Sequence, residues 1–153
     1  MSTPLPRALE AAALGLLIPV LLAGGVGCGT VKSPTEPPPA SGGAVFTFSQ
    51  IQREIFTPTC AKSGCHAAST GGQEGLILDA GQSYSLLVGH PATENGTLNR
   101  VQPGSPETSY VILKLRGDPS IVGQRMPRDG PPYLTAEQID GIAGWIRAGA
   151  PNN

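Results

Sequence analysis

Aromatic and charged residues are both scarce in this chain of 153 residues, which contains three Phe, three Tyr and one Trp. Only 14% of the residues are charged, and the net charge is −1. Because the chain has no excess of basic residues, no nucleic-acid partner is expected. With so few large side chains, the core is either thin or completed by something other than protein.

Several catalytic signatures are missing as well. The chain has no Ser–His–Asp set, no paired carboxylates and no phosphate-binding glycine loop, so an enzyme is not expected. Glycine and proline, by contrast, are abundant, with 21 and 16 residues. This composition predicts many turns and short helices. The length allows one folded domain with a modest core, but not two.

Residues 1–27 have the pattern of an export signal. Arg7 gives a weakly positive start, and the uncharged stretch AAALGLLIPVLLAGGVGC ends at Cys28. Its last part, LLAGGVGC, resembles the lipobox of bacterial lipoproteins, although Gly25 stands where leucine is usual. The resemblance implies a lipid on Cys28, with ordinary cleavage and an uncleaved anchor as the alternatives. The protein is therefore expected in the bacterial cell envelope, facing the periplasm or the exterior.

Residues 28–45 are expected to form a lipid-anchored linker. The segment is rich in Pro, Gly and Ser and has almost no bulky apolar side chain, so it cannot bury enough surface to fold. Its run of prolines would stiffen it as a tether to the membrane. The folded domain is then expected to span residues 46–153.

Helices are the expected elements of this domain, which is predicted to be small, all-α and rich in loops. The first helix, FSQIQREIF, would be capped by Ser49 with Gln52 answering it. The second, DAGQSYSLLVG, would be capped by Asp79 and closed by Gly89. The third lies within GSPETSYVILKLRG, whose apolar run 110–115 also fits a strand.

The last helix has the clearest signals. Thr135 would cap it, and Gln138 would return the capping bond. Leu134 can pack on Ile139 at its start, and Gly149 would end it.

The stretch CAKSGCHA, residues 60–67, follows the first helix and brings together two cysteines and a histidine. In an oxidising compartment a free pair of thiols does not persist. A Cys60–Cys65 disulfide would leave His66 without a role. A zinc ion would need His66 and His90 as further ligands. A haem c would use all three residues, with two thioethers to its vinyl groups and His66 as the proximal iron ligand.

The spacing of the cysteines is unusual for haem attachment. The usual sequence has two residues between the cysteines, and this one has four. Because the vinyl groups have a fixed separation, the extra residues are expected to bulge outward. Gly64, directly before Cys65, tolerates such a backbone.

Apart from the initiator, the chain has one methionine, Met126, which lies 60 residues after His66 in a proline-flanked loop. A thioether held in a rigid loop suits the sixth position of a haem iron. The alternative is a methionine that fills a gap in the core. His90, in the polar loop VGHPATENG, is the rival sixth ligand.

From Phe48 to its end, the chain resembles small monohaem c-type cytochromes of the kind found as exported bacterial lipoproteins and in planctomycete-type cytochrome c domains. The matching stretches are IFTPTCAKSGCH, VQPGSPETSYVILKL, RMP and LTAEQIDGIAGWIRAGAP. The widened cysteine spacing is the main departure. The resemblance implies Cys60 and Cys65 as covalent haem attachments, His66 as the proximal and Met126 as the distal iron ligand.

These expectations describe a membrane-tethered c-type cytochrome that carries single electrons and exchanges them with redox partner proteins. With both axial positions filled, the iron would have no place for a substrate, so the protein would not be an enzyme. The alternative of a different class is a haem-free lipoprotein domain. In that case a Cys60–Cys65 disulfide would stabilise a binding or envelope-structural module.

Overall fold

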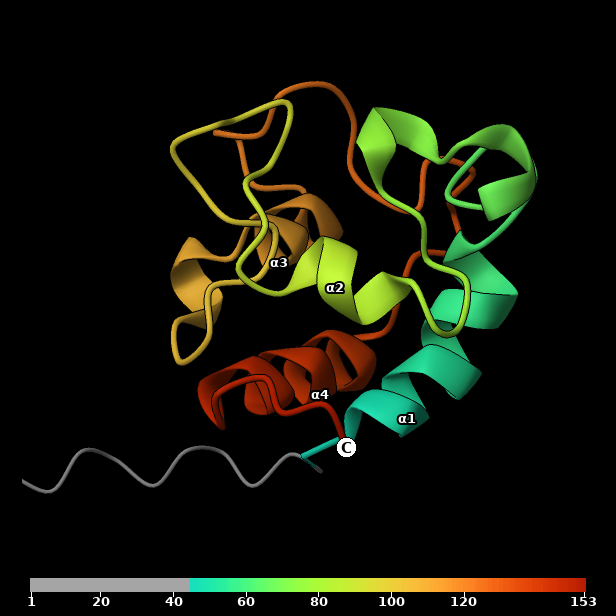
Figure 1. Ribbon diagram of the computed structural model, residues 1–153. Coiled ribbons are helices and arrows are strands. Elements are labelled where there is room, and N and C mark those ends of the chain that lie inside the picture. The colour runs from blue at the N-terminus through green and yellow to red at the C-terminus, as the bar shows by residue number, and fades with distance from the viewer. Residues whose placement is uncertain (1–44) are drawn as a thin grey trace, which may run out of the picture. The chain divides into compact units, whose positions relative to one another are not determined.

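The computed structural model describes residues 45–153, where short helices follow one another along the chain (Figure 1). Within this range there is no strand, and the only β-contacts are two isolated bridges, Val88 with Val101 and Pro91 with Asn99. The described part is therefore all-α, as predicted. The export signal, Cys28 and nearly all of the linker lie outside the described residues. Between residues 45 and 153, no helix has the length and apolar character needed to cross a membrane.

The first helix changes its winding partway along. It begins as α1 (Phe48–Ile51) and continues as a π-helical segment, Gln52–Cys60. In this wider segment Ala61 N donates to Phe56 O, five residues earlier, at 2.8 Å. Pro58 lies inside the segment, and its missing N–H and bulky ring disfavour ordinary α-helical bonding there. The π-helical segment ends at the first cysteine of the motif.

The cap of α1 lies two residues earlier than predicted. Thr47 and Gln50 form a capping box, in which Gln50 N donates to Thr47 Oγ1 at 3.2 Å and Thr47 N donates to Gln50 Oε1 at 2.8 Å. The expectation of Ser49 with Gln52 was wrong. The reason is a long-range contact, because the Ser49 hydroxyl donates to Asn153 O at 2.7 Å. Figure 1 shows this end of the chain beside the start of α1.

The second helix, α2 (Ser83–Leu87), is shorter than predicted. Asp79 does not cap it, since Gln82 is the N-cap residue and makes no side-chain cap bond. The Asp79 carboxylate instead accepts a hydrogen bond from Ala68 N, which ties down the loop after the CAKSGCHA motif. Gly89 follows the helix with a positive φ of 68°.

The apolar run 110–115 is a helix, not a strand. A single 3-10 turn, Pro106–Thr108, is followed by α3 (Tyr110–Arg116). The buried Ser109 separates the two, and its hydroxyl donates to Ser105 O at 2.9 Å. Gly117 ends α3 in the left-handed conformation with φ 70°.

The last helix, α4 (Ala136–Arg147), agrees with its sequence signals. Gln138 N donates to Thr135 Oγ1 at 3.3 Å, and Thr135 N donates to Gln138 Oε1 at 2.9 Å. Leu134 and Ile139 are both buried, and Gly149 lies beyond the helix with φ 94°. The capping prediction is confirmed.

The core brings the buried faces of these helices together. Helix α3 packs on α4, and the Phe48 ring of α1 lies 5.1 Å from the Tyr84 ring and 5.4 Å from the Trp145 ring. Trp145 is 1% exposed, and its Nε1 donates to Pro151 O at 2.8 Å. Three of the few aromatic side chains are thus used in one cluster, apart from the cavity described next.

Candidate functional site

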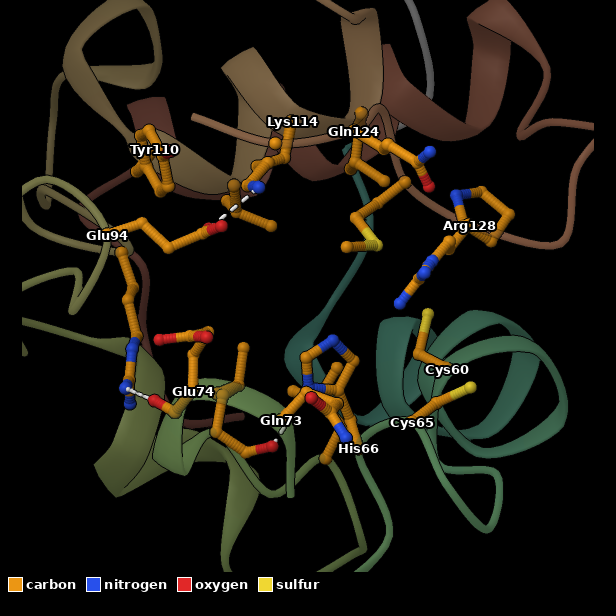
Figure 2. Close-up of a pocket in the computed structure, with 18 of the residues that line it drawn as sticks. Cys60, Cys65, His66, Gln73, Glu74, Glu94, Tyr110, Lys114, Gln124 and Arg128 are labelled. Carbon is orange, nitrogen blue, oxygen red and sulfur yellow. Dashed lines mark hydrogen bonds and ion pairs between the residues drawn. The ribbon is translucent and has the colours of Figure 1, made fainter. Parts of the chain in front are cut away.

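A cavity of about 400 Å³ lies between the loops that follow the π-helical segment and the α3 side of the fold (Figure 2). Its volume is typical of small-molecule sites. Most of its surface is apolar, and the apolar lining residues include Phe56, Leu76, Leu78, Leu87, Val111 and Leu115. The same cavity is lined by four of the residues singled out in the sequence: Cys60, Cys65, His66 and Met126.

The cysteine turn places its middle residues, Lys62 and Ser63, in solvent, whereas Ala61 packs against the core and Gly64 lies at the edge of the cavity. Lys62 and Gly64 are exposed, whereas the two cysteines are half-buried. The turn is closed by a hydrogen bond from His66 N to Cys60 O at 3.2 Å. Gly64 has φ 76°, the left-handed conformation in which glycine is favoured. The outward bulge expected from the sequence is present.

The two thiols are not joined to each other. Within residues 45–153 neither Cys60 nor Cys65 forms a disulfide. Burial raises the pKa of the Cys60 thiol from 9.0 to about 12, although the Lys62 ammonium opposes this in part. A thiol with such a pKa stays protonated at neutral pH.

His66 is oriented by the backbone carbonyl of Leu76. Its Nδ1 lies 3.0 Å from Leu76 O. Because a carbonyl oxygen can only accept, Nδ1 carries the proton and Nε2 is left with its lone pair. Burial lowers the pKa of His66, which the hydrogen bond to Leu76 opposes and the Arg100 guanidinium reinforces. At neutral pH the ring is therefore neutral, the form that binds iron.

Met126 approaches the cavity from a different part of the chain. Its backbone N donates to Lys114 O at 2.9 Å, which attaches its loop to α3. The side chain is partly buried and packs against the hydrophobic core. The thiols and His66, by contrast, follow the first helix. The cavity thus receives ligand-type side chains from two separate segments.

His90 is not brought to the cavity. Its side chain is exposed, and its Nδ1 lies 3.1 Å from the carbonyl oxygen of the neighbouring Pro91. Among residues 45–153, no three His, Cys, Asp or Glu side chains are grouped closely enough to hold a metal ion. The zinc alternative, which needed His66 and His90, therefore gains no support.

Charged residues on the cavity wall were missed by the sequence reasoning. Arg100 is 5% exposed, and its guanidinium donates to Glu74 O at 2.6 Å and Leu86 O at 2.8 Å. Lys114 is buried on α3 and pairs with Glu94 at 2.7 Å. The available signal was a lysine inside an apolar helical run, which is unusual because buried ammonium groups need partners.

The residues around the cavity fit a haem c. The cavity is mostly apolar, as a porphyrin requires, and it has two unpaired thiols of the kind that add to vinyl groups. One neutral imidazole with a bare Nε2 and one thioether line the same space. A haem needs only two ligands from the protein, because the porphyrin supplies the other four. This donor set suits a six-coordinate haem iron better than a free metal ion.

Comparisons with known proteins found no match, whether with a protein-family model, a curated protein or a solved structure. The function proposed below therefore rests on the residues of this chain and on their geometry.

Proposed function

We propose that the chain is a membrane-tethered c-type cytochrome that carries single electrons between redox partner proteins. One observation carries this proposal. Cys60, Cys65, His66 and Met126 line one apolar cavity, although Met126 lies 60 residues from His66 in the sequence. Met126 is the only methionine in the chain besides the initiator, so its place in that cavity supports a specific role.

Each residue has a definite task in this proposal. Cys60 and Cys65 would hold the haem covalently, and His66 and Met126 would bind its iron. When bound, the haem would supply one-electron redox chemistry, with a potential raised by methionine–histidine ligation. The carbonyl of Leu76 keeps the His66 ring in one tautomer and one orientation. The mostly apolar wall would suit the porphyrin.

The anchoring part of the proposal concerns the chain before the cavity. Lipidation at Cys28 would hold the protein at a membrane of the cell envelope, and the proline-rich linker would keep the folded domain clear of it. The net charge of −1 and the absence of a basic excess in the sequence fit partners other than nucleic acids.

The haem-free alternative has weaker support. A Cys60–Cys65 disulfide would explain the two cysteines, but it gives no role to the oriented His66 ring or to Met126. Within the described residues the two thiols are unbonded.

Covalent haem attachment is the experiment that decides between these functions. The full chain is produced with haem-attachment machinery, and the purified protein is extracted with acid and organic solvent. The haem should stay on the polypeptide and add the mass of one haem. A Cys60→Ser, Cys65→Ser double variant, made in the same cells, should gain no mass. Wild-type protein with its two thiols joined and no added mass would establish the haem-free alternative.

A further inference from the structure

Lys114 is an unusual residue for its place in the fold. It lies within the apolar helix α3, and its side chain is only 9% exposed. A buried ammonium group is costly unless charged and polar partners surround it. Lys114 has both kinds of partner, because its Nζ lies 2.7 Å from Glu94 Oε2 and donates to Val122 O at 2.6 Å. Figure 2 shows the ion pair on the cavity wall, away from Cys60 and Cys65.

The loop that leads to Met126 is tied to α3 by several hydrogen bonds. Its first attachment is at Val122, whose carbonyl accepts from Lys114 Nζ and whose N–H donates to Tyr110 Oη at 3.0 Å. Next, Arg125 Nε donates to Leu115 O at 2.8 Å. The last attachment is at Met126 itself, whose N–H donates to Lys114 O at 2.9 Å. Lys114 therefore contacts the loop through both its side chain and its backbone.

Glu94 extends this arrangement to a second loop. It comes from the loop enclosed by the bridge of Pro91 with Asn99, and it lines the cavity, as Lys114 does. Its Oε1 would lie 3.3 Å from a β-carbon at Gly123, so it packs closely against the loop that leads to Met126. The ion pair thus joins the loop that carries Glu94 to helix α3, at the wall of the cavity.

We propose that Lys114, held by Glu94, is a positioning residue that fixes the loop 118–126 on α3 and thereby keeps the Met126 thioether in the cavity. The role of Met126 as an iron ligand rests on the proposed function, but the attachment of the loop does not. An apolar side chain at position 114 would fill the same space but could not donate a hydrogen bond to the Val122 carbonyl. The attachment of the loop 118–126 therefore explains why a charged residue, Lys114, occupies this buried position.

Hydrogen exchange and the visible spectrum, measured on the same purified full-length protein, test this inference. Lys114→Met keeps the length of the side chain but removes its charge and its donor. Glu94→Gln removes the partner charge, and Tyr110→Phe removes only the hydroxyl that accepts from Val122. Arg116→Met is the matched control, because Arg116 is exposed on the same helix and pairs only with Asp140, at 3.5 Å.

In Lys114→Met and Glu94→Gln, the amides of Val122 and Met126 should exchange roughly tenfold faster or more, since a bond to a buried charge is lost. Tyr110→Phe should speed exchange at Val122 more than at Met126. Amides of α4 should keep their rates in all four variants. In the haem-loaded protein, the far-red band of thioether ligation should weaken in Lys114→Met and stay unchanged in Arg116→Met.

Three results would overturn the inference, and they are distinguishable. Unchanged exchange at Val122 and Met126 in both Lys114→Met and Glu94→Gln would show that the ion pair does not hold the loop. Faster exchange with an unchanged far-red band would show that the loop is held for another purpose. A wild-type protein without haem would remove the thioether role together with the proposed function. If Lys114→Met does not fold, Glu94→Gln and Tyr110→Phe still provide the comparison.

Discussion

The backbone carbonyl of Leu76 and burial together prepare the His66 ring for binding a metal ion. Because Leu76 O accepts from Nδ1, the ring presents an unprotonated Nε2, and its lowered pKa keeps it neutral. His90 has a similar contact, from Nδ1 to Pro91 O at 3.1 Å, but its side chain is exposed and does not line the cavity. At the scale of single residues, His66 and His90 differ in burial and in whether they line the cavity.

Met126→Ala tests the sixth ligand. If Met126 binds the iron, its loss should open one axial position, because alanine has no donor atom. The reduction potential should fall, the far-red band should disappear, and added imidazole or carbon monoxide should bind. Potentiometry and absorption spectra measure these changes.

His90→Ala is the matched control for that variant and should change none of these properties. A wild-type protein without the far-red band, and with a potential that responds to His90→Ala, would make His90 the ligand and Met126 a packing residue.

The thiol of Cys60 should react slowly in protein made without haem attachment. Its pKa is raised from 9.0 to about 12, so the reactive thiolate forms only as the pH rises toward 12. At pH 8 the thiolate fraction is then roughly 1,000-fold lower than in the unfolded chain. The higher nucleophilicity of a more basic thiolate offsets about half of this on a logarithmic scale, leaving about a 30-fold slower reaction. Alkylation followed by peptide mass spectrometry measures the reaction rate of Cys60, with urea-unfolded protein as the reference. Equal rates in folded and unfolded protein would contradict the burial of Cys60.

At the scale of elements, the turn from Cys60 to His66 is the feature that departs most from usual haem attachment. The π-helical segment Gln52–Cys60 ends with the first cysteine. The hydrogen bond from His66 N to Cys60 O then closes the turn. The left-handed Gly64 allows the chain to reverse before Cys65. Two additional residues are thus absorbed by the turn on the outside, while both cysteines stay on the cavity side.

Gly64→Ala should destabilise this turn. A β-carbon at Gly64 meets no atom within 4 Å, so the cost comes only from the left-handed backbone, about 1 kcal/mol of unfolding free energy. Gly96→Ala is the matched control, because Gly96 also has open space but no positive φ. Denaturant unfolding should show a lower midpoint for Gly64→Ala and little change for Gly96→Ala. Equal effects of the two substitutions would mean that the left-handed conformation at Gly64 is not required.

At the scale of the whole molecule, the proposed function combines a haem-binding domain with a membrane anchor. The described domain carries the cavity, and export and anchoring are expected from the sequence of residues 1–44. An electron carrier on a lipid anchor can meet partners at the membrane surface without crossing it. The two parts make separate predictions, so each can fail without the other.

Cys28→Ser tests the anchor. Wild-type protein should sediment with membranes, because a lipid on Cys28 partitions into the bilayer. The variant should move to the soluble fraction or remain unprocessed with its signal attached. Cell fractionation and the mass of the mature N-terminus measure both outcomes. Soluble wild-type protein that begins at another residue would exclude lipidation and leave the haem proposal unaffected.

The success of each sequence prediction depended on how local its cause was. The cap of α4 was predicted correctly, because Thr135 and Gln138 lie one helical turn apart and need no other part of the chain. The cap of α1 was wrong, because Ser49 bonds to Asn153, more than a hundred positions away. Asp79 was wrong for a similar reason, since it bonds back to Ala68.

For the site, the sequence by itself determined the chemistry of the candidate ligands: two thiols, an adjacent imidazole and one methionine in a proline-flanked loop. Only the tertiary structure decided that Met126 and not His90 reaches the cavity, because that depends on a hydrogen bond to Lys114 on α3. The pairing of Lys114 with Glu94 joins positions 20 residues apart and leaves no local pattern. Burial supplied the last part, since no spacing of residues reveals that Cys60 and His66 are desolvated enough to shift their pKa values.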